Sequence, residues 1–176
     1  MIQMMRYAGS KVAHASAILQ RIPVSAPIFV EPFLGSGAIF CNIADRYDRY
    51  VLNDLNSHIM SVWAFIKEST FADLLNVQNE MQSRYGMYTN KSAYYAIRRH
   101  YNEHMFNSTS VERGAHLYFL INSCINSLCR FGPNGFNQGY GNREYCMSPT
   151  DFASIKTKLQ KAELSATQIS CISTIH

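Results

Sequence analysis

Residues 28–37 read IFVEPFLGSG, and this stretch decides the fold class of the chain. The apolar, β-branched run at 28–31 predicts a short buried strand, and the proline and glycines after it predict a loop. AIFCNIADR at 38–46 predicts a helix directly behind that loop. YVLND at 50–54 predicts a second buried strand, and residues 56–69 predict the next helix. Strand, glycine loop, helix, strand and helix within about forty residues is typical of a parallel α/β sheet.

The segments on either side of this unit are mostly helical in pattern. KVAHASAILQRI at 11–22 predicts a helix that a proline ends. Only helical patterns occur over 71–126, whereas 130–149 is a Gly/Asn/aromatic loop without a period. Residues 151–164 predict a last helix, and TQISCIS at 167–173 predicts a further strand. We therefore expect α/β structure at both ends of the chain, with a helical and loop insertion between them.

The composition is that of a folded domain with one core. The 176 residues are 47% hydrophobic and 16% charged, which excludes a mainly disordered chain. Sixteen Lys and Arg against twelve Asp and Glu give a net charge of +4, which permits a polyanionic partner without requiring one. No apolar run approaches the length of a membrane span, and the first residues lack the apolar region of a signal peptide. We expect neither secretion nor membrane insertion.

The five cysteines, Cys41, Cys124, Cys129, Cys146 and Cys171, form no CxxC pair. Their odd number argues against a disulfide framework, and their spacing argues against a zinc ribbon. Reduced thiols in a cytoplasmic protein are the better interpretation.

The glycine pair in the loop is the first motif that carries chemistry. Gly35 and Gly37 allow the backbone to approach a ligand, and a following helix N-terminus would favour a negatively charged group. Asp54 ends the next strand, 17 residues after Gly37, where an acidic residue can meet ribose hydroxyls. The dinucleotide pattern GxGxxG is not complete, because Ile39 and Phe40 follow. Spacing alone leaves two alternatives, a nucleoside cofactor site and an ordinary structural turn.

Several blocks, in order along the chain, resemble the Dam-type (D12 class) DNA adenine-N6 methyltransferases, which use S-adenosylmethionine (SAM). The blocks are YAGSK at 7–11, FVEPFLGSG at 29–37, VLNDLN at 51–56, LIN at 120–122, NSLCRF at 126–131 and GFNQGYG at 135–141. The resemblance implies a Rossmann-like, SAM-dependent methyltransferase sheet, incomplete here, with a mostly helical target-recognition insertion. The implied domains are a SAM-binding part at 1–58, the insertion at 59–148, and a return to the catalytic domain at 149–176.

The resemblance also assigns residues to the cofactor. Lys11 would pair with the SAM carboxylate, and Tyr7 would place an aromatic ring near the sulfonium. Asp54 would receive the ribose hydroxyls. The full set that it implies is Tyr7, Gly9, Lys11, Glu31, Phe33, Gly35, Ser36, Gly37 and Asp54. Ser10 departs mildly from the family, because a second glycine is common there. The alternative for Tyr7 and Lys11 is a simple surface N-terminus.

Double-stranded DNA is the partner that the resemblance implies. Asn126 and Arg130 match the DNA-contacting loop of the family, and Arg130 is our choice for a guanine contact. Asn137 and Arg143 complete the predicted DNA-binding set. The basic residues of the insertion, which could face phosphates, are Arg84, Lys91, Arg98, Arg99, Arg113, Arg130 and Arg143. The alternatives are a solvated basic face and a packed irregular loop.

His100 and His104 lie in the sequence HYNEH, the HxxEH pattern of inverse zinc hydrolases. Two histidines four residues apart share a helical face, which is a real metal-ligand spacing. Nothing downstream supplies an obvious third ligand. The exposed polar face of an amphipathic helix is therefore the better interpretation, and we expect no metal.

The catalytic tetrapeptide of such amino-methyltransferases, Asp-Pro-Pro-Tyr or a close variant, does not occur in the chain, which contains no Pro-Pro at all. We therefore predict no catalytic residue within these 176 residues. The expected function is that of an adenine-specific DNA methyltransferase fragment, inactive alone, with a GATC-like target by resemblance only. The alternatives are a non-catalytic SAM- or DNA-binding remnant, or one chain of a split methylase that a second chain complements. A methyltransferase that acts on RNA or on a small molecule is a third, weaker alternative.

Overall fold

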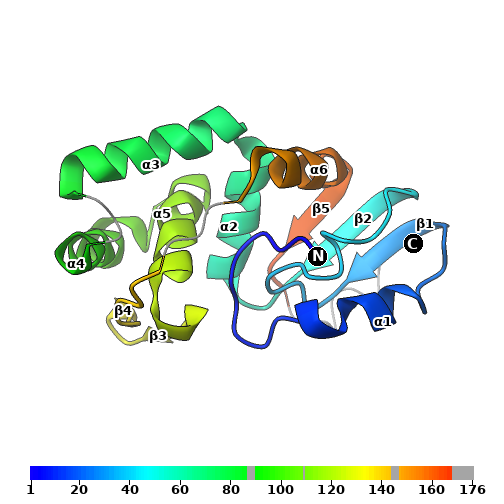
Figure 1. Ribbon diagram of the computed structural model, residues 1–176, viewed down its shortest axis with the longest axis horizontal. Coiled ribbons are helices and arrows are strands. Elements are labelled where there is room, and N and C mark those ends of the chain that lie inside the picture. Colours follow the sequence, from blue (N-terminus) through cyan, green and yellow to red (C-terminus); the bar gives the residue numbers. More distant parts are fainter. Residues whose placement is uncertain (87–89, 109, 144–146, 168–176) are drawn as a thin grey trace.

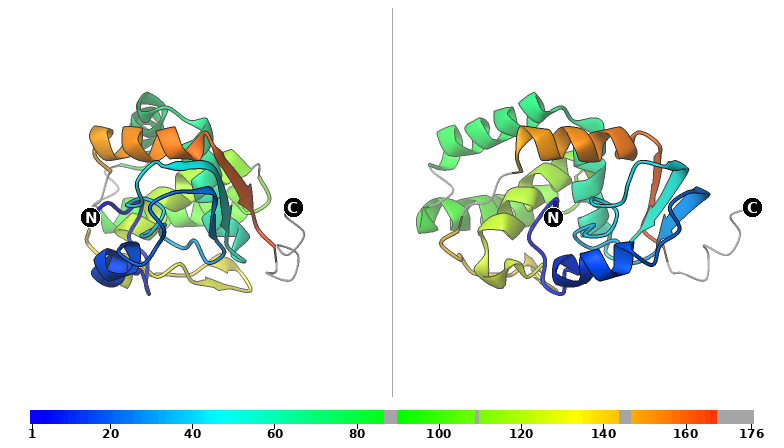
Figure 2. Two further views of the ribbon diagram at one scale, coloured as in Figure 1. Left: turned by 90° about the vertical axis from the view of Figure 1, so that its right-hand side faces the viewer. Right: turned by 45° about the vertical axis from the view of Figure 1, so that its right-hand side comes forward.

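The computed structural model describes residues 1–86, 90–108, 110–143 and 147–167. A small sheet lies at one side of the molecule and a group of helices at the other, with helix α2 (Ser57–Glu68) between them (Figure 1). Two further views show the same division, with α6 (Pro149–Leu159) running along one side of the sheet (Figure 2).

The sheet has three parallel strands in the order β1-β2-β5. They are β1 (Ala26–Glu31), β2 (Tyr47–Asn53) and β5 (Ala162–Ser165). β2 is central, and its last four residues are buried. The predicted strands at 28–31 and 50–54 and the mixed α/β class with a parallel sheet are thus confirmed. The expected burial of the first strand is wrong, because Ile28 and Val30 in β1 are 37% and 44% exposed.

The helices begin at side chains that accept hydrogen bonds from otherwise unpaired amides. Asn56 caps α2 by accepting from the amides of His58 and Ile59. Thr70 and Asp73 form a capping box at the start of α3 (Phe71–Tyr85), and Asn90 caps α4 (Lys91–His100). The other helices are the short α1 (Ala15–Leu19), the π-helical turn Tyr101–Met105 that continues α4, and α5 (Ser110–Ser123). Two single 3-10 turns, Val12–His14 and Ile125–Ser127, precede α1 and follow α5. No helix in the described part of the chain is long and apolar enough to cross a membrane.

The last predicted helix is shorter than the sequence suggested. α6 begins at Pro149 and ends at Leu159, and Ser148 caps it by accepting a hydrogen bond from the amide of Asp151. The prediction of helix as far as residue 164 is wrong, because 162–164 belong to β5. Pairing with β2 decides the conformation there, since Ala162 is buried beside it. The strand predicted at 167–173 lies outside the described residues, except for Thr167, which is not in a strand.

The helix predicted over 38–46 is also wrong. This segment forms successive turns. Side chains occupy the carbonyls that a helix would use: Asn42 donates to the oxygen of Ala38 at 2.8 Å. The Lys158 ammonium donates to the carbonyls of Phe40, Cys41 and Ile43 at 2.7, 2.8 and 3.1 Å. These side-chain bonds compete with the helical ladder and stabilise the irregular path.

A small hairpin forms within the segment expected to be an irregular loop. β3 (Phe131–Gly132) pairs antiparallel with β4 (Gly135–Phe136), and Pro133 and Asn134 make the tip. The ring of His58 from α2 stacks on Phe131 with centroids 4.0 Å apart, so the hairpin is fixed to the body of the molecule.

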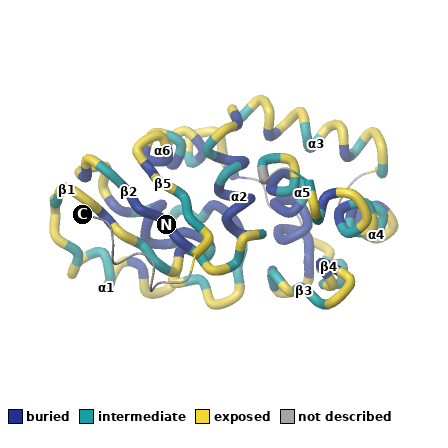
Figure 3. Tube along the Cα trace, turned by 180° about the vertical axis from the view of Figure 1, so that it is seen from behind, coloured by how far each residue is buried: buried dark blue, intermediate teal, exposed yellow. Residues whose placement is uncertain are grey.

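One hydrophobic cluster runs from the sheet through α2 to α5. Figure 3 shows this as buried chain along β2, α2 and α5, with exposed chain on α3 and α4. α2 and α5 pack closely at Gly114, where a Cβ atom would lie 1.9 Å from the Ser61 carbonyl oxygen. The predicted boundary between the SAM-binding part and the insertion, between residues 58 and 59, falls in the first turn of α2. This helix packs against α5 on one side and against β5 and α6 on the other.

Candidate functional site

A cavity of about 230 Å³ opens at the carboxyl ends of β1 and β2. This is the edge of a parallel sheet where ligands bind. Its walls come from the N-terminal segment, the loop after β1 and the residue after β2. The lining residues are Tyr7, Gly9, Ser10, Lys11, Glu31, Phe33, Leu34, Gly35, Ser36, Ala38 and Asp54. Eight of the nine residues predicted to bind the cofactor therefore meet at one cavity, and the ninth, Gly37, is not in its lining.

Hydrogen bonds connect the three walls. The Gly35 amide donates to Asp54 Oδ2 at 2.8 Å, and the Asn56 amide donates to Asp54 Oδ1 at 3.0 Å. The hydroxyls of Ser10 and Ser36 are 2.8 Å apart, which ties the N-terminal segment to the loop. Ser10, noted above as a departure from the family pattern, thus has a specific partner.

Glu31 ends β1 and closes the loop behind the cavity. Its carboxylate accepts a hydrogen bond of 2.9 Å from the Phe40 amide. Burial raises the pKa of Glu31 to about 7, against the opposing effects of that bond and of the Lys158 charge. The helix N-terminus that we expected behind the loop does not form, and the side chain of Glu31 uses the Phe40 amide instead.

The N-terminal wall combines an aromatic ring with a cation. The Tyr7 ring packs against Gly35, where a Cβ atom would lie 3.4 Å from its carbons. Burial raises the pKa of Tyr7 to about 12, so its phenol is neutral at physiological pH. The Lys11 ammonium donates to the Gly9 carbonyl at 3.2 Å. Lys11 and Asp54 therefore give the cavity one positive and one negative group.

Gly37 has a packing role. A Cβ atom on it would lie 2.4 Å from the Trp63 ring, and its φ of +66° is one that side chains disfavour. The Trp63 indole donates to the Gly35 carbonyl at 3.0 Å. Trp63 thus supports the glycine loop from behind.

Lys158 is a supporting residue that the sequence analysis missed. Its side chain is 4% exposed and donates to three carbonyls of the turns at 40–43. Burial lowers the pKa of its ammonium. One signal was available, because Lys158 shares the helical spacing of the buried Ile155 and Leu159. A lysine on the apolar stripe of a helix needs buried acceptors.

The four predicted DNA-binding residues, Asn126, Arg130, Asn137 and Arg143, are all exposed on the segment that follows α5. The Asn137 amide donates to the Arg130 carbonyl at 3.1 Å, so these two flank the base of the hairpin. Asn126 has a left-handed φ of +54°. The Ala8 amide donates to the Ser127 carbonyl at 3.3 Å, which joins this segment to the wall of the cavity.

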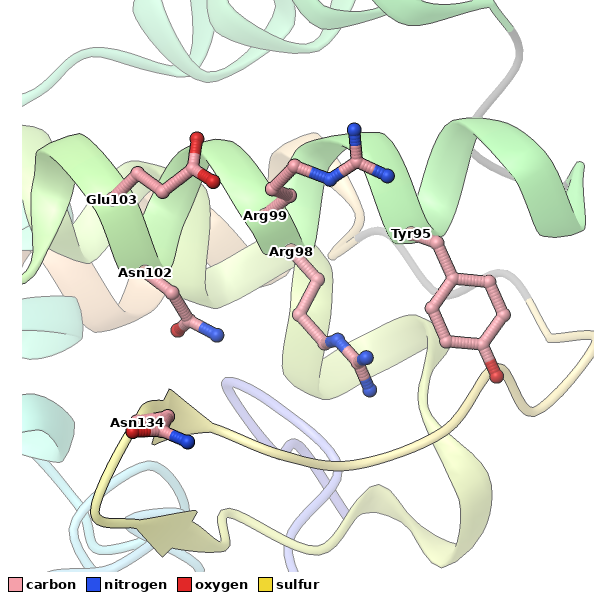
Figure 4. Close-up of a pocket in the computed structure, with 6 residues that line it drawn as sticks. All are labelled: Tyr95, Arg98, Arg99, Asn102, Glu103 and Asn134. Atoms are coloured by element: carbon pink, nitrogen blue, oxygen red, sulfur yellow. The ribbon is translucent and has the colours of Figure 1, made fainter.

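A second cavity, of about 530 Å³, lies between α4 and the hairpin tip. Its lining is polar and basic: Tyr95, Arg98, Arg99, Asn102, Glu103 and Asn134 (Figure 4). Sequence reasoning counted the two arginines only among scattered basic residues, because the hairpin that makes the other wall was not predicted.

The HxxEH histidines lie at the end of α4 and in its π-helical turn. The His100 and His104 rings have centroids 4.9 Å apart. The described residues hold no group of three or more side chains placed to ligate a metal ion. Cys41, Cys124 and Cys129 are free thiols, and Cys146 and Cys171 lie outside the described residues.

Comparison with known proteins identifies a family that matches nearly the whole chain and relatives that match more than three quarters of it. The family model of the D12 class N6 adenine-specific DNA methyltransferases matches residues 7–174. The DNA adenine methylase of Serratia marcescens is 29% identical over 139 residues, which cover 78% of this chain and 48% of that protein. The type II methyltransferase M.MjaIII of Methanocaldococcus jannaschii is 26% identical over 148 residues, covering 78% and 51%.

A third relative, the DNA N-6-adenine-methyltransferase of Escherichia phage P1, is 28% identical over 137 residues, or 77% of this chain and 17% of that protein. The chain thus spans about half the length of its Serratia and Methanocaldococcus relatives. Because the family model covers all but the first six and last two residues, the chain belongs to the D12 class of N6 adenine-specific DNA methyltransferases.

Proposed function

We propose that this chain provides the SAM-binding and DNA-recognition parts of an adenine-N6 DNA methyltransferase that acts in the cytoplasm. The meeting of eight predicted cofactor residues at one cavity carries the proposal, together with membership of the family. In this proposal the parallel sheet is part of a Rossmann-like methyltransferase sheet, and the helices and hairpin after residue 58 form the target-recognition insertion.

The donors and acceptors around the cavity suit SAM. The Lys11 ammonium would pair with the carboxylate of the methionine moiety. Asp54 would accept from the ribose hydroxyls, since each carboxylate oxygen can accept a second bond. Phe33 is 74% exposed at the cavity, so its ring is available to stack on the adenine. When bound, SAM would supply an electrophilic methyl group.

Duplex DNA would bind at the segment after α5. Arg130 would hydrogen bond to a guanine edge in the major groove, and Asn137 lies beside it at the base of the hairpin. Asn126 and Arg143 would add contacts on the same segment. The hydrogen bond between the Ala8 amide and the Ser127 carbonyl supports this proposal, because it joins the segment after α5 to the wall of the cavity, and a methyl transfer to a base requires the two ligands to be close together.

The chain alone is proposed to bind both ligands without transferring the methyl group. None of its residues forms an Asp-Pro-Pro-Tyr-like tetrapeptide, which would orient the adenine amine. A second polypeptide that carries this motif would complete the enzyme, as in a split methylase. The alternative is a non-catalytic remnant that binds SAM or DNA and has no second polypeptide to complete it.

Isothermal titration calorimetry with SAM, followed by a transfer assay with methyl-labelled SAM and adenine-containing duplex, tests the proposal. We expect saturable SAM binding by the 176-residue chain and no labelled DNA. Absence of SAM binding would refute the cofactor site. Labelled DNA would refute the predicted inactivity. A matched RNA duplex in the binding assay would separate the RNA-methyltransferase alternative.

A further inference from the structure

The HYNEH segment at 100–104 is part of no metal-ligand group in the described residues, but it contacts the hairpin of β3 and β4. From Tyr101 onward it forms the π-helical turn that continues α4. Such turns are rare and frequently lie at functional sites. Two neighbouring residues of the turn, Tyr101 and Asn102, reach the hairpin. The turn therefore has a task that the metal pattern in the sequence did not indicate.

Asn102 binds the free side of β4. The Asn137 amide donates to the Arg130 carbonyl, so these two residues form a hydrogen-bonded pair of the antiparallel ladder. The next pair, Phe131 with Phe136, is then a non-hydrogen-bonded pair, and the backbone groups of Phe136 point away from β3. Asn102 meets both groups: its Nδ2 donates to the Phe136 carbonyl at 3.0 Å, and its Oδ1 accepts from the Phe136 amide at 2.8 Å. The side-chain amide thus takes the place of a third strand.

This contact matters because the hairpin is small. Each of its strands has two residues, and an isolated two-stranded hairpin is marginally stable in water. Phe136 is 1% exposed, so its backbone groups need partners within the protein. Gly135 leaves the room that Asn102 occupies, because a Cβ atom there would lie 2.5 Å from Asn102 Oδ1. In Figure 4 the Asn102 side chain points from its helix toward the hairpin tip that carries Asn134.

β3 is connected to the same turn through α2. The His58 ring stacks on Phe131 with centroids 4.0 Å apart, and His58 Nδ1 lies 3.1 Å from the Tyr101 hydroxyl. The buried Tyr101 ring also meets Phe136 edge-on, with centroids 6.5 Å apart. Both strands of the hairpin are therefore held by contacts that lead to two adjacent residues, Tyr101 and Asn102.

The placement of the hairpin decides where the predicted base-reading residues lie. Arg130 directly precedes β3, and Asn137 directly follows β4. A base edge is read by paired hydrogen bonds of defined geometry, and the side chains that make them must be held to within about 0.5 Å by supporting contacts. Asn102 supplies such a contact from 34 residues away in the sequence.

We propose that Asn102 is a positioning residue for sequence discrimination, which orients Arg130 and Asn137 by binding the backbone of Phe136 and contacts no DNA itself. The inference rests on the proposed DNA binding and assigns part of the target preference to a residue outside the base-reading segment. Loss of the amide should loosen the hairpin and lower the preference for the target. The general attraction between the basic insertion and the DNA backbone should remain, because it depends on charge.

Asn102→Leu, which has nearly the same size and cannot hydrogen bond, tests the inference in the 176-residue chain. Hydrogen exchange followed by NMR should show faster exchange of the Phe136 amide, because it loses its acceptor. Anisotropy competition between a GATC duplex and duplexes changed at one base pair should show a preference lowered about 10-fold, near the lower end of what a bidentate base contact contributes. The affinity for a duplex without the site should stay unchanged.

Asn107→Leu, at an exposed position just after the turn, is the matched control and should change neither measurement. Asn102→Asp keeps the acceptor for the Phe136 amide but loses the donor to its carbonyl. It should therefore retain the amide protection and lose part of the preference. This variant takes the place of Asn102→Leu if thermal melting shows that the leucine variant does not fold.

The outcomes separate this inference from the proposal beneath it. Faster exchange of the Phe136 amide with an unchanged target preference would overturn the inference alone. Equal weakening of all duplexes by Asn102→Leu would show that Asn102 contacts the DNA backbone, and would overturn it too. An unchanged Phe136 amide would show that the hairpin is held without Asn102, with the same consequence. A wild-type chain that binds no duplex, or binds all duplexes equally, would instead refute the DNA recognition on which the inference rests.

Discussion

Asp54 accepts a hydrogen bond of 2.8 Å from the backbone amide of Gly35, so one carboxylate connects the ends of the two strands, β1 and β2, that frame the cavity of about 230 Å³. The second oxygen of Asp54 accepts from the Asn56 amide at the start of α2. The side chain is therefore oriented before any ligand arrives, which reduces the cost of binding.

Asp54→Ala should weaken SAM binding by about 10- to 100-fold, since a hydrogen bond to a charged group contributes roughly 1.5–3 kcal/mol. Calorimetry with the purified chain measures the change. Asp48→Ala is the matched control, because Asp48 is an exposed carboxylate on β2 away from the cavity. Equal affinity in the wild type and the Asp54 variant would refute the assignment.

Lys158→Met should lower the free energy of unfolding by about 2 kcal/mol or more, because it leaves three buried carbonyls without their donor. SAM affinity should fall as well, since the turns that Lys158 fixes adjoin the cavity. Urea denaturation followed by circular dichroism measures the first effect. Lys161→Met is the control: its ion pair with Asp45 is solvent-exposed and contributes at most about 1 kcal/mol.

Gly114→Ala should destabilise the fold by about 1–3 kcal/mol, because its Cβ atom would meet the Ser61 carbonyl and force α5 away from α2. Glu112→Ala, at an exposed position on α5, should stay within about 0.5 kcal/mol of the wild type. Thermal melting of both variants is sufficient. Equal melting temperatures would show that the two helices can separate freely.

His58 should make the fold less stable as the pH falls. Burial lowers its pKa to about 4, with Arg113 adding to the effect, whereas an unfolded histidine titrates near about 6.5. The unfolded chain therefore binds more protons between these values, and stability is lost as the pH falls from about 6.5 toward about 4.

His58→Gln should reduce this loss when melting temperatures are measured across that range. Glu31, with its pKa raised to about 7, acts in the opposite sense, because the folded chain keeps its proton at higher pH. The comparison with wild type remains valid, since both chains carry Glu31. Identical pH profiles would contradict the half-buried, neutral state of His58.

Arg130→Ala should relax sequence preference by about 1–3 kcal/mol at one base pair of the target, as expected for a lost bidentate guanine contact. Competition between duplexes that differ at single positions measures it. Arg143→Ala is the useful comparison, because an exposed arginine that contacts only phosphate would weaken all duplexes equally. An unchanged preference after Arg130→Ala would remove that residue from the base-reading set.

Local patterns predicted the parts of the site that depend on neighbours in sequence. The apolar runs of β1 and β2 and the loop between Glu31 and Gly37 follow from residues within a few positions of one another. The cavity could be anticipated because parallel strands end at one edge, which brings Asp54 to Gly35.

Contacts between distant segments decided the parts that were missed. The turns over 38–46 replace a helix because Lys158, 118 residues from Phe40, occupies carbonyls that the helix would use. Residues 162–164 are a strand because β2 offers an edge to pair with. The cavity on α4 exists because Asn102 binds the backbone of Phe136, 34 residues away. None of these partners is visible in a local window of sequence.

The three bonds of Lys158 also set an order of events during synthesis. Phe40 and Lys158 are 118 residues apart, so the turns behind the cavity leave the ribosome long before their donor is made. Domains generally form from the N-terminus onward as the chain emerges, but this loop must wait for α6. The nascent chain can therefore complete the cavity at the ends of β1 and β2 only after the segment that follows α5 has been translated.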